Sequence, residues 1–107
     1  MILYNVTVKV NAEIQDEWLQ WMKEIHIPDV MRTGFFTEYK LCRILERDES
    51  DGVTYAIQYL CNSLADYETY RLKFAPALQR EYSEKFKDRF VAFRTVMEVE
   101  ARTNNLK

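Results

Sequence analysis

Glycine, proline, cysteine and histidine are scarce in this 107-residue sequence, which has two glycines, two prolines, two cysteines and one histidine. So few glycines and prolines argue against long irregular loops. The two cysteines, Cys42 and Cys61, fall in separate strand-like segments with no histidine or further cysteine nearby. A zinc-ligand spacing is therefore missing, and we expect buried free thiols, with no bound metal and no cofactor.

Blocks of positive charge and long apolar runs are missing as well. The net charge is −2 and the 15 lysines and arginines are scattered, so nucleic acid is not an expected partner. No apolar run approaches the roughly 20 residues of a membrane helix, so we expect no membrane association. The first ten residues lack the basic start and the cleavage site of a signal peptide, and we expect a cytoplasmic protein.

The composition that is present is that of a globular protein, with 48% hydrophobic and 30% charged residues. The length predicts one domain, which we expect over residues 1–101, followed by a polar tail over residues 102–107.

Alternation with a period of two predicts a strand near each end of the chain. In the first strand the core-facing set is Ile2, Tyr4, Val6, Val8 and Val10. In the last strand the bulkier set is expected to face the core, namely Val91, Phe93, Thr95, Met97 and Val99. The opposite set is then expected to point away, namely Phe90, Ala92, Arg94, Val96 and Glu98.

Spacings of three and four residues predict a helix after the N-cap residue Asn11. Its buried face is expected to hold Ile14, Trp18, Trp21, Met22 and Ile25. Because the residue before a proline disfavours the helical conformation, this helix should stop near His26. Pro28 then opens a short turn that Gly34 closes. A second helix is predicted after Ser63, and Pro76 should kink or restart it.

Residues 35–47 and 53–61 are strand-like, and the acidic turn that ends at Gly52 predicts that they pair as a hairpin. Both faces of the earlier strand are mixed, so a bulge there would decide which side Arg43 occupies. The resulting order, βαββαβ, predicts a ferredoxin-like α+β fold. In this fold two helices cover one face of a four-stranded antiparallel sheet, with the first strand between the third and fourth.

The other face of the sheet is expected to be half apolar and to form a two-fold contact with a second copy, as in a dimeric α+β barrel. Asn5, Gln58 and Arg94 are expected together on that open face. One interpretation is a polar site for an anionic small-molecule ligand, with Arg94 as the fixed charge. The other is a hydrogen-bonded polar layer that sets the register of the dimer.

His26 is the candidate for acid–base chemistry, because its titration lies near neutral pH and it follows the first helix. Asp29 is the carboxylate closest to it in the sequence. A histidine at a helix C-terminus is also favoured by the helix dipole alone, so a structural role stays open. Arg43 shares its parity with Leu41 and Leu45, and a charge there must pair with a carboxylate or line a cavity.

The stretches "MILYNVTV", "EWLQWMKEIHIPDVMRTGFF", "LCRILE", "YAIQYL" and "FAPALQREYSEKFKDRFVAFRTVMEV" together resemble the family called domain of unknown function family 4286. It consists of short, mostly Bacteroidetes-type proteins, and its most specific segments are "HIPDV..TG.F" and "RFVAFRT". The resemblance covers nearly the whole chain. It implies a ferredoxin-like dimeric barrel and implies no activity.

A histidine followed by a turn and a glycine is also similar, at the level of the fold, to dimeric barrel enzymes of the EthD and antibiotic-monooxygenase kind. That similarity points to a cleft near His26, Arg43 and Asp29. Two hypotheses follow. The chain is a homodimeric ligand-binding or interaction module, or it is a cofactor-free isomerase or monooxygenase that uses His26 as acid or base on a small anionic or aromatic molecule.

Overall fold

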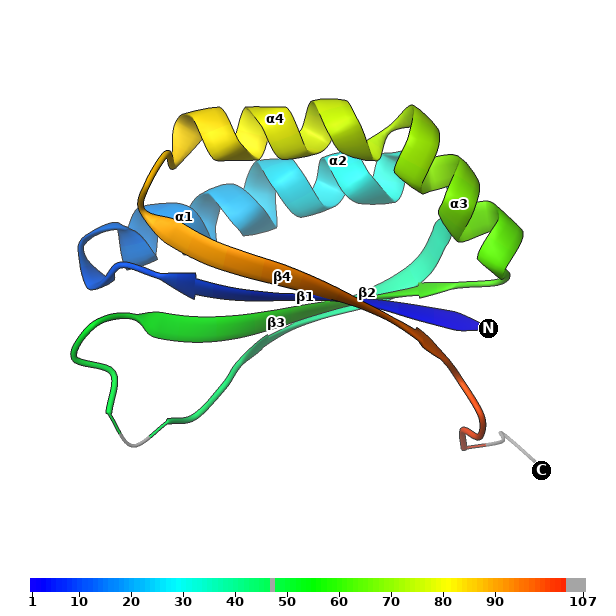
Figure 1. Ribbon diagram of the computed structural model, residues 1–107, viewed down its shortest axis with the longest axis horizontal. Coiled ribbons are helices and arrows are strands. Elements are labelled where there is room, and N and C mark those ends of the chain that lie inside the picture. The colour runs from blue at the N-terminus through cyan, green and yellow to red at the C-terminus, as the bar shows by residue number, and fades with distance from the viewer. Residues whose placement is uncertain (47, 104–107) are drawn as a thin grey trace.

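A computed structural model describes residues 1–46 and 48–103 of the chain. The expected tail, residues 102–107, lies largely outside the described residues. Four antiparallel strands form one sheet in the order β2-β3-β1-β4, and the helices cover one face of it (Figure 1). The strands are β1 (Ile2–Val10), β2 (Phe36–Arg43), β3 (Val53–Cys61) and β4 (Phe90–Glu98). The predicted ferredoxin-like α+β fold and its strand order are confirmed.

The first helical stretch is longer than expected. A 3₁₀ turn η1 (Ala12–Ile14) leads into α1 (Gln15–Trp21), a π-helical turn η2 (Met22–His26) and α2 (Ile27–Arg32). The expected stop near His26 is wrong, because the Ile27 N–H bonds the Met22 carbonyl and the wider turn carries the helix past Pro28. Gly34 then ends the helix with a φ of +84°, as predicted.

The π turn also shifts which residues face the sheet. Ile25, expected in the core, is 44% exposed, whereas Ile27 is fully buried. One extra residue in the turn rotates the following helix by about one position. His26 is consequently only partly exposed and lies against the core aromatic Trp21.

The second helical stretch follows the sequence pattern closely. The Ser63 side chain accepts a hydrogen bond from the Asp66 N–H, 3.1 Å away, and so caps α3 (Leu64–Lys73). Pro76 lies in the first turn of α4 (Ala75–Lys85), where its missing N–H costs nothing. The predicted restart of this helix at Pro76 is therefore confirmed, and the bend is visible in Figure 1.

A bulge in β2 determines which of its residues face the helices. Phe36 pairs with Cys61 and Glu38 with Leu60, so Thr37 is the extra residue. Because of the bulge, Phe36 faces the helices on the same side as Tyr39, Leu41 and Arg43. The residues of β3 that pair with these last three also face the helices, namely Tyr59, Ile57 and Tyr55. Cys42 lies on the other face and is exposed, so the expectation of a buried thiol holds for Cys61 alone.

The expected faces of β4 are wrong. Val6 pairs with Arg94 and Val8 with Ala92, and directly opposed residues share a face. The set that faces the helices is therefore Phe90, Ala92, Arg94, Val96 and Glu98. Both parities of β4 carry apolar residues, and the bulkier set lies on the side that no helix covers, where Val91 and Phe93 are 72% and 61% exposed.

We use the name open face for the side of the sheet without helices. Its residues are Leu3, Asn5, Thr7 and Lys9 of β1, Glu38, Lys40 and Cys42 of β2, Thr54, Ala56, Gln58 and Leu60 of β3, and Val91, Phe93, Thr95 and Met97 of β4. The core lies on the opposite side and includes both tryptophans, as predicted. Among the described helices, none combines the length and the apolar character that crossing a bilayer requires.

Candidate functional site

A cleft opens between the two helical stretches and the sheet. Its floor comes from β1, β3 and β4, and its walls come from the π turn, α2, α3 and α4. The open space within it is about 30 Å³, which is room for one or two water molecules. Its polar lining residues are Tyr4, His26, Tyr59, Tyr70, Gln79, Tyr82, Ser83 and Arg94. We call this space the helix–sheet cleft.

Arg94 is the charged residue that lines this cleft. Its Nε donates a hydrogen bond to the Tyr4 hydroxyl, 3.1 Å away, and no other described residue accepts from the guanidinium, so its terminal nitrogens are open to solvent. Arg94 takes part in none of the ion pairs formed among residues 1–46 and 48–103. Among the described residues the charge of Arg94 therefore has no ionic partner, and solvent screens it because the side chain is exposed.

The effect of that charge reaches several groups. Burial raises the pKa of Tyr4, Tyr70 and Tyr82, and the Arg94 guanidinium partly offsets the rise in each case. A positive potential at these hydroxyls favours an anion placed among them. The cleft is therefore suited to hold a small negatively charged molecule.

Four buried tyrosines line the cleft, and we call three of them, Tyr4, Tyr59 and Tyr70, the tyrosine cluster. The Tyr4 ring lies 5.8 Å from that of Tyr59 and 6.1 Å from that of Tyr70, between ring centroids. Burial raises the pKa of Tyr59 well above its ordinary value, and the neighbouring Tyr70 and Tyr4 add to the rise. All three hydroxyls are therefore protonated at neutral pH and can donate.

His26 enters the cleft from the π turn. Its imidazole stacks on Trp21 at 5.2 Å between ring centroids and meets the Tyr82 ring edge-on at the same distance. Burial lowers the pKa of His26 to about 4, the Asp29 carboxylate works against the shift, and Arg94 adds to it. The imidazole is therefore neutral at pH 7, with one N–H that donates a hydrogen bond and one bare nitrogen that accepts.

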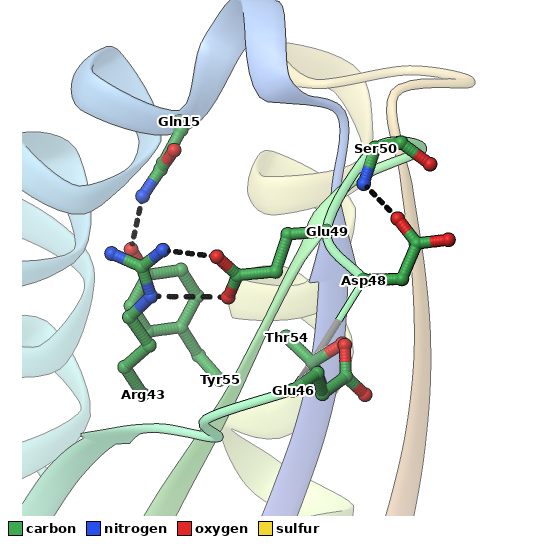
Figure 2. A network of polar contacts seen from close by, with 8 residues as sticks. All are labelled: Gln15, Arg43, Glu46, Asp48, Glu49, Ser50, Thr54 and Tyr55. Carbon is green, nitrogen blue, oxygen red and sulfur yellow. Dashed lines mark hydrogen bonds and ion pairs between the residues drawn. The ribbon is translucent and has the colours of Figure 1, made fainter.

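The structure brings His26 and Arg94 together in one cleft and places Arg43 elsewhere. Arg43 lies at the end of β2, where its Nη2 is 2.5 Å from Glu49 Oε1, and it lines a shallow groove beside α1 (Figure 2). Gln15 donates to the Tyr55 hydroxyl beside it. Arg43 thus pairs with a carboxylate, which was one of its two expected environments. Asp29 is 2.5 Å from Arg32 Nη1 and acts on His26 only through its charge.

Asn5 and Gln58 are cross-strand partners on the open face, as expected, but Arg94 is on the opposite face. Asn5 Nδ2 donates to Thr7 Oγ1 at 2.9 Å, and Gln58 lines a separate groove of about 200 Å³ with Leu3, Lys40 and Arg102. The expected grouping of Asn5, Gln58 and Arg94 is therefore wrong, because the Arg94 side of β4 faces the helices and not the open face. The tyrosine cluster, by contrast, was missed because its members lie on three separate elements.

A metal centre finds no support in the described residues, where no group of three or more histidine, cysteine, aspartate or glutamate side chains could hold an ion. The helix–sheet cleft offers instead a guanidinium, a neutral imidazole and several phenol hydroxyls on apolar walls. This combination of groups favours a small organic anion by charge and hydrogen bonding, and a ligand larger than one or two water molecules requires the walls of the cleft to move apart.

Comparison with protein families gives one match, to the model described as "Domain of unknown function (DUF4286)", over residues 1–100. Comparison with curated protein sequences gives no match.

Solved structures share the fold at low sequence identity. A dimeric ferredoxin-like protein from an uncultured marine organism is 11% identical with a TM-score of 0.73, covering 98% of this chain and all of the other. An ethyl tert-butyl ether D (EthD) family protein from Bacillus halodurans is 13% identical with a TM-score of 0.65, covering 92% and 100%. An antibiotic biosynthesis monooxygenase is 10% identical with a TM-score of 0.65, covering 94% and 100%. These similarities establish the shared fold.

Proposed function

The chain belongs to the family described as domain of unknown function family 4286, and we propose that it is a homodimeric protein that binds a small organic anion in the helix–sheet cleft. The observation that carries the proposal is Arg94, a cation on the cleft wall without a carboxylate partner in the described part of the chain. The cytoplasm is the proposed location, in keeping with two cysteines that do not pair.

The balance of charge in the cleft supports an anion over a neutral ligand. The Arg94 side chain is exposed, so water satisfies its free donors when no ligand is bound, and a ligand acceptor would replace that water. Tyr4 accepts from one of the five N–H donors of Arg94, and a ligand carboxylate can accept from two of the remaining four in a bidentate contact. At an exposed guanidinium such a contact contributes about 1 kcal/mol or less, which corresponds to up to roughly 5-fold in affinity.

Thermal denaturation in the presence of benzoate and of its methyl ester tests this proposal. A bound acid should raise the midpoint of wild type, because a ligand that binds only the folded state stabilises it, and the uncharged ester should not. Arg94→Gln should abolish the shift and Arg94→Lys should weaken it. Arg71→Gln is the matched control, because Arg71 pairs with Glu68 on the outer surface of α3. An acid that binds the Arg94→Gln variant equally well would overturn the proposal.

Catalysis by His26 is the alternative, and the structure favours it less. With a pKa lowered to about 4, His26 is a poor acid–base catalyst at neutral pH, since such catalysts work best with a pKa near the operating pH. Asp29, the carboxylate that would orient it, is paired with Arg32. A cofactor-free isomerase or monooxygenase therefore stays a prediction, and turnover of the bound acid that is lost in His26→Ala would support it.

The open face supports the homodimer. Four strands of about nine residues present roughly 600 Å² of sheet, which approaches the roughly 800 Å² that each partner of a stable interface buries. Its β4 edge exposes Val91, Phe93 and Met97, so the corrected face is more apolar than the sequence suggested. A second copy is the proposed occupant, because a two-fold axis would place this apolar edge against the same surface of the partner.

Light scattering on two matched variants tests the dimer. Phe93→Asp places a charge at the centre of the exposed apolar strip and should give monomers at concentrations where wild type is dimeric. Leu72→Asp is the control, because Leu72 is similarly exposed, at 66%, but lies on α3 away from the open face. A monomeric wild type, or a dimer unaffected by Phe93→Asp, would contradict the proposal.

A further inference from the structure

The tyrosine cluster contains hydroxyls whose hydrogen-bonding partners the described residues do not supply. Tyrosine hydroxyls that form hydrogen bonds there are those of Tyr4, Tyr55 and Tyr82. Tyr59 and Tyr70 are 2% and 3% exposed and take part in none. Buried phenol hydroxyls normally find a partner, so these two raise the question of what satisfies them.

The two hydroxyls reach open space. Among the described residues, no fully enclosed side-chain oxygen is left without a hydrogen bond, so the Tyr59 and Tyr70 oxygens are not sealed inside the core. Both residues line the helix–sheet cleft. Their partner is therefore whatever occupies the cleft, whether water or a ligand.

The position of Tyr59 relative to Arg94 sets the shape of that occupant. Tyr59 and Tyr4 are directly opposed on neighbouring strands, and their rings lie 5.8 Å apart and 25° from parallel. Cross-strand partners on one face project together, so the two rings rise from the sheet side by side. One hydroxyl is held by Arg94 and the other is open.

We propose that the ligand is a short hydroxy- or oxo-carboxylic acid, with its carboxylate on Arg94 and Tyr4 and its hydroxyl or carbonyl on Tyr59 and Tyr70. This inference rests on the proposed function, since it names the class of anion that the cleft takes. The apolar lining of the cleft includes Val6, Val8, Ile57 and Phe90, which suit an apolar or aromatic body. The open space of about 30 Å³ holds one or two water molecules, so an acid of this class requires α4 to move outward at Leu78 and Gln79.

A site with a buried hydroxyl aimed at one ligand group rejects the analogue that lacks the group, because its own hydroxyl is then left without a partner. Affinity for 4-hydroxybenzoate should therefore exceed that for benzoate by roughly 5- to 10-fold in wild type. The aliphatic pair 3-hydroxybutyrate and butyrate should show the same order. Tyr59→Phe should erase the preference while retaining benzoate binding.

Isothermal titration calorimetry of the four acids with wild type, Tyr59→Phe and Arg94→Gln measures these affinities and tests the inference. Tyr59→Phe removes only an oxygen that takes part in none of the tyrosine hydrogen bonds formed among the described residues, so the variant should fold, and an unchanged thermal midpoint checks this. Equal affinity for the hydroxy and deoxy acids in wild type would overturn this inference and leave the anion site standing. Binding of none of the acids, or binding unaffected by Arg94→Gln, would remove the proposed function as well.

Discussion

The imidazole of His26 stacks on the indole of Trp21, with ring centroids 5.2 Å apart and an angle of 22° between the ring planes. The pair exists because the π turn Met22–His26 rotates the helix and turns His26 towards the sheet. Burial against the indole is also what lowers the pKa of His26 to about 4. The stacking therefore links a local backbone irregularity to the charge of the cleft.

The stability of the protein should fall as the pH decreases from about 6.5 to about 4. The unfolded chain protonates its histidine near pH 6.5, whereas the folded chain resists protonation until pH 4, so the unfolded state binds more protons between these values. At pH 4.5 the loss amounts to about 2.5 kcal/mol of the free energy of unfolding. Urea denaturation at pH 7.5 and 4.5 measures it.

His26→Gln separates this effect from the titration of carboxylates. The variant lacks the group, so its loss of stability between pH 7.5 and 4.5 should be smaller than that of wild type by about 2.5 kcal/mol. Because His26 is the only histidine, its ring resonance in an NMR titration also gives its pKa without ambiguity. A pKa above 6 would show that the imidazole is not buried as described.

The π turn makes opposite predictions for two neighbouring isoleucines. Ile27→Ala should cost about 2–5 kcal/mol, since Ile27 is fully buried and the truncation leaves a cavity. Ile25→Ala should cost about 0.5 kcal/mol or less, since that side chain is 44% exposed. Denaturation midpoints of the two variants test this directly. A regular helix would reverse their order.

The sequence was sufficient for the fold because each strong pattern had a single physical interpretation. Alternation in β1 placed one residue set in the core, Ser63 began a helix, and Pro76 restarted it. The π turn left no comparable signal, because a proline after Ile27 is equally consistent with a helix that stops. Tertiary packing of Ile27 and Val30 against the core decides in favour of continuation.

The site was harder to predict, and β4 shows why. Its two faces are both apolar in part, so hydrophobicity could not choose between them, and pairing with β1 decided the matter. Arg94 was therefore expected on the open face with Asn5, whereas it lines the cleft together with His26. When a strand carries an arginine among apolar residues and both of its faces are partly apolar, both assignments of that arginine, to the core side and to the open side, should be considered.

The two glycines should respond differently to alanine. At Gly52, where φ is +146°, an added Cβ would lie 2.6 Å from the Val10 carbonyl oxygen, so the β2–β3 connection must shift. At Gly34, where φ is +84°, no atom lies within 4 Å of the added Cβ, and only the left-handed backbone opposes it. We expect Gly34→Ala to cost about 1 kcal/mol and Gly52→Ala at least twice that, by chemical denaturation. Equal costs would contradict the described contact with Val10.

Two tyrosines of the cleft allow a matched comparison of a bonded and an unbonded hydroxyl. Trp18 Nε1 donates to the Tyr82 hydroxyl, and the indole is fully buried. Tyr82→Phe leaves that N–H without an acceptor, so it should cost about 1–3 kcal/mol in the free energy of unfolding. Tyr59→Phe removes a hydroxyl that takes part in none of the tyrosine hydrogen bonds among the described residues, and it should change stability by less than about 0.5 kcal/mol. A loss for Tyr59→Phe as large as that for Tyr82→Phe would mean that the Tyr59 hydroxyl serves the fold and is not free for a ligand.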